Sequence, residues 1–246
     1  MDPVEPLLAQ MRAHRSVRRY AAAPVPEADI RAAVAAAQCA ATSSWVQAYS
    51  LLQVTEAAVR QALVPLVGGQ AHVAEAGAFF VVLADTRRHR LVAERASAPY
   101  ASNLEAFLVA VIDAALFGQN LALAFEAQGY GTCFIGGLRN ELAQVDRLLE
   151  LPHGVYPLFG LTAGIPAEDP GLRPRLPVDT VWFKDRYPPD GAVLEGIAAH
   201  DAAAREYYAA RGTPGRDWSG ATWRKHRAPL REHLAEYYRE KGASFD

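Results

Sequence analysis

A short basic segment, HRSVRRY over residues 14–20, has side chains that suit an anion. Arg15 and Arg18 bracket Ser16, so that two planar guanidinium groups and one hydroxyl lie within four residues. This combination suits a phosphate monoester better than a carboxylate, because each guanidinium presents a fork of N–H donors. Taken alone, such a run is more often a solvated basic turn.

A second basic cluster, Arg173-Pro174-Arg175, has the same character. Its two guanidinium groups are held apart by a proline, which stiffens the backbone between them. Two rigid basic forks in one chain of this size indicate that they bind a shared anion.

Two glycine-containing stretches are candidates for close contact with a ligand. The stretch that begins at Gly129 has Phe134 where a dinucleotide fingerprint needs its third glycine, and it follows an expected helix, so we reject a Rossmann site. Gly136 and Gly137 follow an apolar stretch typical of a buried strand. Paired glycines there allow a backbone to approach a flat ligand, although an ordinary strand-to-helix turn explains them equally well.

Other chemistries find little support in the sequence. It has no GxSxG, HExxH or P-loop motif, and Cys39 and Cys133 lack the spacing of a zinc site or a disulfide framework. With 25 basic and 27 acidic side chains, the near-neutral charge argues against nucleic acid as a partner. The residues from Met1 to Met11 do not resemble a secretory signal, and we expect a cytoplasmic protein.

Apolar periodicity predicts helices that alternate irregularly with four or five strands, which favours an α+β sheet flanked by helices. A surface loop or a short helix is expected within residues 86–103, and Pro157 suggests an edge or a bulge in the last strand. The expected helices are 3–13, 27–40, 56–67, a short piece ending at 75, 104–127, 139–151, 193–211 and 226–241, and the expected strands are 50–54, 79–84, 132–135 and 155–164.

The helix expected over residues 104–127 is the most apolar part of the chain and is long enough to cross a membrane. Asp113 and four other polar residues interrupt it, which makes a membrane location costly. Because it is apolar on every side, we expect it in the core or in a subunit interface, and we favour the interface.

The chain is expected to form one domain with an appended arm. Residues 1–190 make up the core, and residues 191–246 form a helical arm of the same domain. The arm contains a turn-rich loop at 211–216 and several aromatic side chains, which we expect to pack against the domain or a partner subunit.

Five ordered motifs together resemble the nitroreductase family, and specifically its branch of NADPH-dependent flavin reductases and oxygen-insensitive nitroreductases. They are HRSVRRY, VGGQAHV at 67–73, CFIGGLRN at 133–140, LFGLTAGIP at 158–166 and LRPRLP at 172–177. The likeness extends from about residue 7 to about residue 240. It implies a nitroreductase-like fold with a mainly antiparallel sheet, and a homodimer with FMN in two sites at the subunit interface.

The resemblance also implies which residues bind FMN, with Arg173, Pro174 and Arg175 closing around its phosphate. Thr42 stands where the family commonly has serine, and Arg173 where it commonly has lysine, but both keep the donor or the charge. The expected contacts are His14, Arg15, Ser16, Val17, Arg18, Thr42, Gln70, Phe134, Ile135, Gly136, Gly137, Arg173, Pro174 and Arg175.

We expect Arg15 and Ser16 at the phosphate, Arg18 at the flavin ring and Gln70 at its pyrimidine edge. In the family branch that this chain resembles, a mobile loop late in the chain binds the extra phosphate of NADPH. Arg211 and Arg216 stand at the matching positions. The expected reaction is ping-pong electron transfer from NADPH through FMN to free flavin, nitroaromatic compounds or quinones, without a catalytic side chain beyond the flavin and without a metal. The alternatives are a flavin carrier or sensor without turnover, and another flavin reaction on the same fold.

Overall fold

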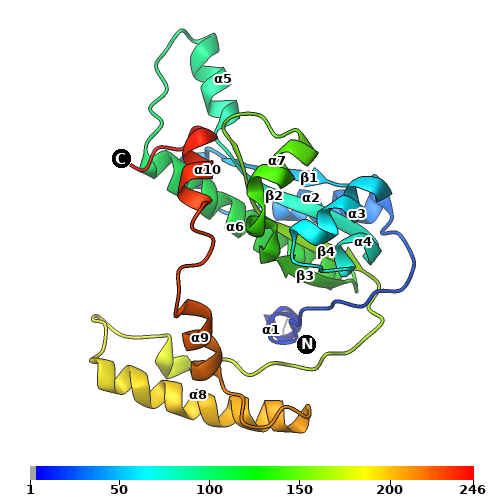
Figure 1. Ribbon diagram of the computed structural model, residues 1–246, viewed down its shortest axis with the longest axis vertical. Helices are drawn as coiled ribbons and strands as arrows, with labels where there is room; N and C mark the ends of the chain where they lie inside the picture. Colours follow the sequence, from blue (N-terminus) through cyan, green and yellow to red (C-terminus); the bar gives the residue numbers. More distant parts are fainter. Residues whose placement is uncertain (1–3) are drawn as a thin grey trace. The chain divides into compact units, whose positions relative to one another are not determined.

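A computed structural model describes residues 4–246, and the chain divides into two compact units (Figure 1). The first comprises the residues up to Pro170 together with His233–Asp246, and the second comprises Gly171–Glu232. The C-terminal residues return to the first unit because Tyr237 and Tyr238 are buried in its core. The division therefore differs from the expected core and arm, which meet at residue 190.

The first unit contains a four-stranded sheet with the order β1-β2-β4-β3, in which every neighbouring pair is antiparallel. Among the described residues this confirms the expected α+β class with a mainly antiparallel sheet of four or five strands. The strands are β1 (Tyr49–Gln53), β2 (Ala78–Asp85), β3 (Gly131–Ile135) and β4 (Val155–Gly164).

Helices cover both faces of the sheet, and β2 is buried along its whole length. Because side chains alternate along a strand, Phe80 and Val82 face one apolar cluster while Phe79 and Val81 face the other. The first cluster includes side chains of α2 (Glu27–Ala37), α6 (Leu104–Ala127) and α10 (Leu234–Glu240), and the second includes side chains of α3 (Ala57–Leu66), α4 (His72–Glu75) and α7 (Leu142–Leu149).

Two remaining helices of the first unit agree with the sequence pattern. α1 (Val4–Arg12) matches the first predicted helix, except that Pro3 lies outside the described residues. α5 (Arg87–Arg95) is the short helix that was one of the two interpretations of this charged stretch.

Pro157 was expected to mark an edge or a bulge in the last strand, and the structure shows a bulge and no edge. β4 is an interior strand, paired with β2 on one side and β3 on the other, so Pro157 does not mark an edge. The pairing with β2 shifts its register between Val82 and Leu83, opposite Phe159 and Pro157. A proline has no N–H to donate, and this bulge accommodates it inside the sheet.

α6 lies in the core and also presents an exposed apolar stripe. It is long and apolar enough to cross a membrane by length and composition alone. Asp113, Phe117, Leu121 and Phe125 are nevertheless at most 1% exposed within the first unit. At intervals of four residues, other apolar side chains remain open to solvent in this single chain, namely Leu104, Leu108, Ile112 and Leu116.

The second unit contains the short helix η3 (Val178–Thr180), α8 (Asp190–Ala210) and α9 (Trp218–His226). The continuous helix expected over residues 226–241 is not formed. α9 ends at His226, and α10 begins only at Leu234. Pro229 lies in the gap, where it cannot donate the backbone hydrogen bond that a helix interior requires.

Candidate functional site

The basic segment lies along the free edge of the sheet, beside β3. The backbone N–H of Val17 donates to the carbonyl of Thr132 at 2.9 Å, and Ser16 pairs with Thr132 as in a parallel ladder. Val17 is 3% exposed, and a Cβ at Gly131 would lie 2.7 Å from its Cγ2 atom. Arg18, the next residue, is exposed, whereas the side chain of Ser16 hydrogen-bonds the buried Cys133 thiol.

Tyr20 fixes the other end of this segment. Its hydroxyl donates to the carbonyl of Val17 at 2.6 Å and lies 2.8 Å from Thr162 Oγ1 on β4. Burial raises the pKa of the Tyr20 phenol, so the hydroxyl keeps its proton at neutral pH. The sequence pattern did not single out this role, although Tyr20 closes the HRSVRRY motif.

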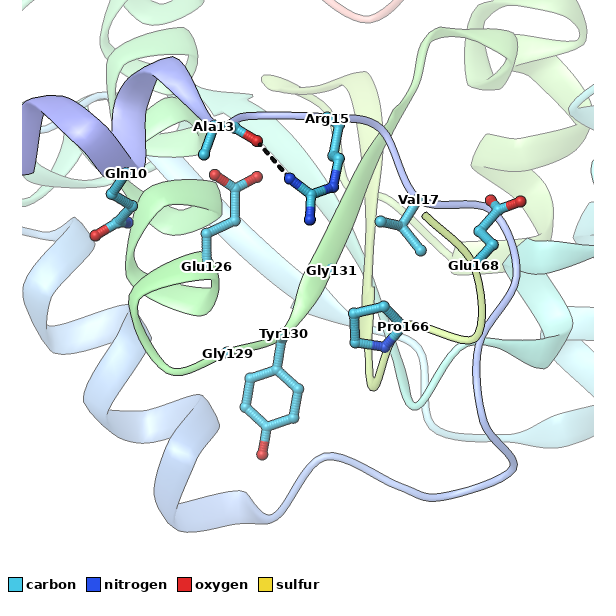
Figure 2. A pocket seen from close by; sticks show the side chains of 10 residues that line it. All are labelled: Gln10, Ala13, Arg15, Val17, Glu126, Gly129, Tyr130, Gly131, Pro166 and Glu168. Carbon is cyan, nitrogen blue, oxygen red and sulfur yellow. Dashed lines mark hydrogen bonds between the residues drawn. The ribbon is translucent and has the colours of Figure 1, made fainter. Parts of the chain in front are cut away.

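Two carboxylates that follow β4 meet the basic segment. Arg15 Nε lies 3.1 Å from Asp169 Oδ1, and the backbone N–H of Arg18 donates to Glu168 Oε1 at 2.7 Å. Figure 2 shows Arg15 and Glu168 in the wall of a pocket of about 250 Å³. The other residues that line this pocket are Gln10, Ala13, Val17, Glu126, Gly129, Tyr130, Gly131 and Pro166.

A second part of the site forms where the GGQ turn meets the end of β3. Gln70 Nε2 donates to the carbonyl of Val67 at 2.7 Å. A Cβ at Gly137 would lie 2.5 Å from Gln70 Nε2, whereas a Cβ at Gly136 would meet its nearest neighbour, Arg139 Nη2, at 3.6 Å. Gly137, and not Gly136, is therefore the glycine that lets the turn after β3 approach the GGQ turn closely.

His72, four residues after Gly68, is a feature that the sequence analysis did not select. It is 7% exposed, and among the described residues its Nε2 has no hydrogen-bond partner. Burial lowers the pKa of His72, and the positive charge of Arg18 lowers it further. The orphaned nitrogen fits a site that gains a polar partner when a ligand binds.

The residues between these two parts lie on β3 and the turn after it. Phe134 is half-buried and packs edge-on against Phe159, with ring centroids 5.5 Å apart. The side chain of Ile135 is fully buried, so only its backbone is available to a ligand. Gly136 and Gly137 open the short helix η2 (Gly136–Asn140).

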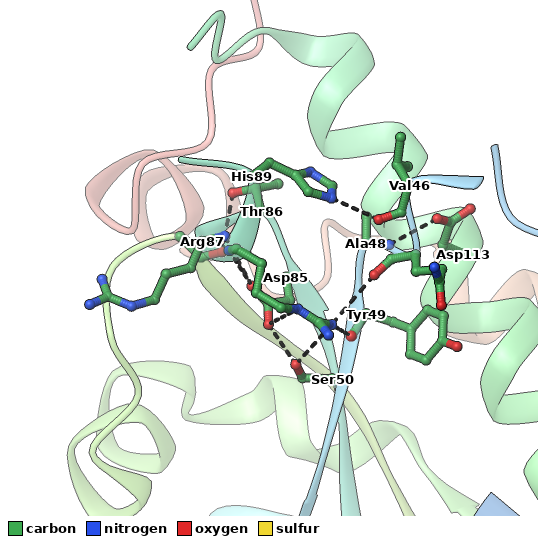
Figure 3. A network of polar contacts seen from close by, with 12 residues as sticks. Val46, Ala48, Tyr49, Ser50, Asp85, Thr86, Arg87, His89 and Asp113 are labelled. Carbon is green, nitrogen blue, oxygen red and sulfur yellow. Dashed lines mark hydrogen bonds and ion pairs between the residues drawn. The ribbon is translucent and has the colours of Figure 1, made fainter. Parts of the chain in front are cut away.

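Thr42 lies on a different loop, directly before the short helix η1 (Ser43–Trp45). The buried Asp113 of α6 anchors this loop, since its carboxylate accepts the N–H of Ser43 at 2.9 Å and that of Ala48 at 3.0 Å (Figure 3). Trp45 has a positive φ of 58° and is 83% exposed. The loop is thus fixed to the helix that carries the exposed apolar stripe.

The remaining predicted residues belong to the second unit. Arg173 and Arg175 are exposed in an extended stretch, and their role at the phosphate stays a prediction. Arg211 follows α8 and lies over the ring of Tyr207, and Arg216 lies over the ring of Tyr208. Arg216 also lines a surface pocket together with Arg224, which the sequence analysis did not select.

Comparisons with known proteins agree with the motifs. The sequence matches the nitroreductase family over residues 11–165 and the C-terminal domain of that family over residues 173–246. It is 39% identical over 241 residues to an oxygen-insensitive NADPH nitroreductase from Salmonella typhimurium, covering 97% of this chain and 98% of the relative.

Two further relatives extend this result. An FMN reductase (NADPH) from Bacillus subtilis is 37% identical over 235 residues, covering 93% of this chain and 94% of the relative. The solved structure of B. megaterium NfrA1 superimposes with a TM-score of 0.94 at 38% identity, covering 97% of this chain and 99% of that chain. The expected nitroreductase-like fold is confirmed.

The paired glycines allow a matched test of the corner at Gln70. We expect Gly137→Ala to weaken FMN binding at least about tenfold, because the added methyl would clash with the Val67 carbonyl and with Gln70 and so displace the GGQ turn. Gly136→Ala, which meets only an ordinary contact, should keep the affinity within about twofold. Fluorescence titration of each apoprotein with FMN measures both constants, and equal affinities for the two variants would contradict this description of the corner.

Proposed function

Because the chain belongs to the nitroreductase family, we propose that it uses FMN to pass electrons from NADPH to free flavin, nitroaromatic or quinone acceptors by a ping-pong mechanism. One observation carries this proposal: the basic segment lies along β3, and the turn after β3 packs against the GGQ turn. The names of the relatives, an NADPH nitroreductase and an FMN reductase (NADPH), support the same two cofactors.

Each part of the convergent site suits one portion of FMN. Arg15 and Ser16 have side chains that suit the phosphate. Gly137 lets the turn after β3 pack closely against Val67 and Gln70, and the amide of Gln70 suits the polar edge of the flavin ring. When bound, FMN supplies the redox chemistry.

The protein's own contribution is electrostatic and steric. The positive charge of Arg18 would favour the reduction of FMN held near it, because FMN becomes more negative on reduction. Burial lowers the pKa of His72, which keeps this side chain neutral and adds no second positive charge. Within the described residues the site needs no side-chain acid or base, because donor and acceptor only have to take turns at the same flavin face.

We further propose that the functional unit is a homodimer formed through α6. Its exposed apolar stripe is of the kind that marks subunit interfaces. Asp113 fixes the loop of Thr42 and Trp45 to the same helix. A second subunit at α6 is then expected to receive Thr42 at its FMN site, which explains why Thr42 lies on a separate loop. A cytoplasmic location also belongs to this proposal.

The second unit is the proposed site for the extra phosphate of NADPH. Arg216 lines a pocket of about 480 Å³ with Pro214, Gly215, Ala221 and Arg224. The Arg216 guanidinium lies 4.6 Å from the centre of the Tyr208 ring, and this cation–π contact orients it. We assign Arg211 and Arg216 to NADPH, with Arg224 as an added candidate.

Steady-state kinetics test the central proposal. We expect double-reciprocal plots against NADPH at several fixed concentrations of a quinone or a nitroaromatic compound to give parallel lines, as ping-pong kinetics require. NADPH should also bleach the yellow holoprotein under anaerobic conditions. A yellow protein that NADPH does not bleach would instead support a flavin carrier or sensor.

The dimer is tested by Ile112→Glu, which places a charge in the centre of the proposed interface. We expect sedimentation to show dissociation, and FMN affinity to fall about tenfold or more, because a buried unpaired charge is costly. Ile112→Leu keeps an apolar side chain and serves as the control. A wild-type protein that sediments as a monomer with FMN bound would refute the proposed interface.

The NADPH assignment predicts a selective defect. In Arg211→Ala and Arg216→Ala, the KM for NADPH should rise about tenfold through loss of a charged hydrogen bond, while the KM for NADH stays unchanged. Arg186→Ala alters another exposed arginine of the second unit and should leave both values unchanged. Parallel increases for NADPH and NADH would show that these arginines do not recognise the extra phosphate.

A further inference from the structure

Glu126, in the last turn of α6, connects three separate segments of the first unit. Its Oε1 accepts from Thr132 Oγ1 at 2.7 Å and lies 2.7 Å from His14 Nδ1. The Glu126 side chain is only 12% exposed. Figure 2 shows its carboxylate on the same side of the pocket as Arg15. One carboxylate oxygen thus joins the start of the basic segment to the edge strand.

This position is electrostatically unfavourable for a carboxylate. The C-terminal end of a helix carries the negative end of its dipole, which disfavours an anion there. Glu126 is the last residue but one of the 24-residue helix α6. Neither helix stability nor attraction of a nearby anion favours a carboxylate at this position. Its two hydrogen-bond partners, Thr132 and His14, are therefore the contacts that give Glu126 a role.

Glu126 acts at the place where the basic segment leaves α1. Gln10 on α1 donates to the carbonyl of Leu123 at 2.7 Å, one turn before Glu126. After His14, the next backbone hydrogen bond from this segment to the sheet runs from Val17 to Thr132. Arg15 and Ser16 lie between these two attachments, and Thr132 takes part in both, through its side chain to Glu126 and through its backbone to Val17.

We propose that Glu126 is a positioning residue for the FMN phosphate, which holds His14 and Thr132 so that Arg15 and Ser16 present their donors together. This inference rests on the proposed function. It assigns no direct contact with FMN to Glu126. Preorganised donors lose less conformational freedom on binding than mobile ones, and this difference is the contribution that Glu126 makes.

For Glu126→Ala, the proposal predicts a loss of FMN affinity, whereas charge alone predicts a gain. Removal of a negative charge near a phosphate site should strengthen phosphate binding if charge alone matters. Glu126→Ala removes both the charge and the acceptor, whereas Glu126→Gln removes the charge but keeps an amide oxygen that accepts from Thr132 and His14. The comparison of these two variants separates positioning from charge.

The test measures dissociation constants of the full-length apoprotein for FMN and for riboflavin, which lacks the phosphate. In Glu126→Ala, we expect FMN binding to weaken about tenfold and riboflavin binding to change less than about twofold. Glu126→Gln should bind FMN at least as tightly as the wild type. Glu94→Ala, which alters an exposed carboxylate on α5, should change neither constant.

Three outcomes would overturn the inference. Equal loss of FMN and riboflavin affinity in Glu126→Ala would indicate a general structural role. Tighter FMN binding in the same variant would mean that the Glu126 charge dominates. Loss of FMN affinity in Glu126→Gln as large as in Glu126→Ala would exclude the hydrogen-bond acceptor as the cause. If the wild-type protein binds neither ligand, the proposed function fails as well, so that the two failures are distinguishable.

Discussion

The backbone hydrogen bond from Val17 to Thr132 is the contact on which the arrangement of the first unit's site depends. An edge strand exposes a row of unpaired N–H and C=O groups, and here the basic segment covers part of that row on β3. The same pairing buries Val17 against Gly131. Protection of a sheet edge and placement of the basic segment therefore have one physical cause.

α6 connects the basic segment to the core of the first unit and to the loop of Thr42. Its buried face contributes Phe117 and Leu121 to the core, while Asp113 in its middle and Glu126 near its end hold two different loops. Both carboxylates accept hydrogen bonds from outside the helix, which offsets the cost of their burial. A helix that looks like a membrane span by composition is thus the scaffold that sets the distance between the Thr42 loop and the basic segment.

Most candidate binding residues of the first unit lie outside its hydrophobic core. The doubly buried strand β2 and the two apolar clusters fix this unit, and among its candidate binding residues only Phe134 and Ile135 take part in the clusters. The others lie at the periphery, on an edge segment and on turns. Such peripheral segments tolerate sequence change while the core stays constant.

The sequence by itself determined the fold class, most element positions and the residue types that suit FMN, because periodicity and short motifs are local properties. α6 and β4 have the predicted bounds, whereas the helix predicted across Pro229 fails because a local apolar pattern does not register the missing N–H donor. Only the tertiary structure placed Pro157 inside the sheet, since strand order depends on pairings between distant residues.

Contacts between residues far apart in the sequence also determine the candidate site, and local patterns do not predict them. The motif HRSVRRY indicated an anion, but no local pattern could predict that Glu126, more than a hundred residues later, holds its first residue. Likewise, the orphaned nitrogen of His72 arises from burial, which results from packing of α4 on the sheet and not from its neighbours in sequence. Motifs therefore specify which side chains can bind, whereas long-range contacts decide how those side chains are held, because hydrogen bonds and burial depend on proximity in space.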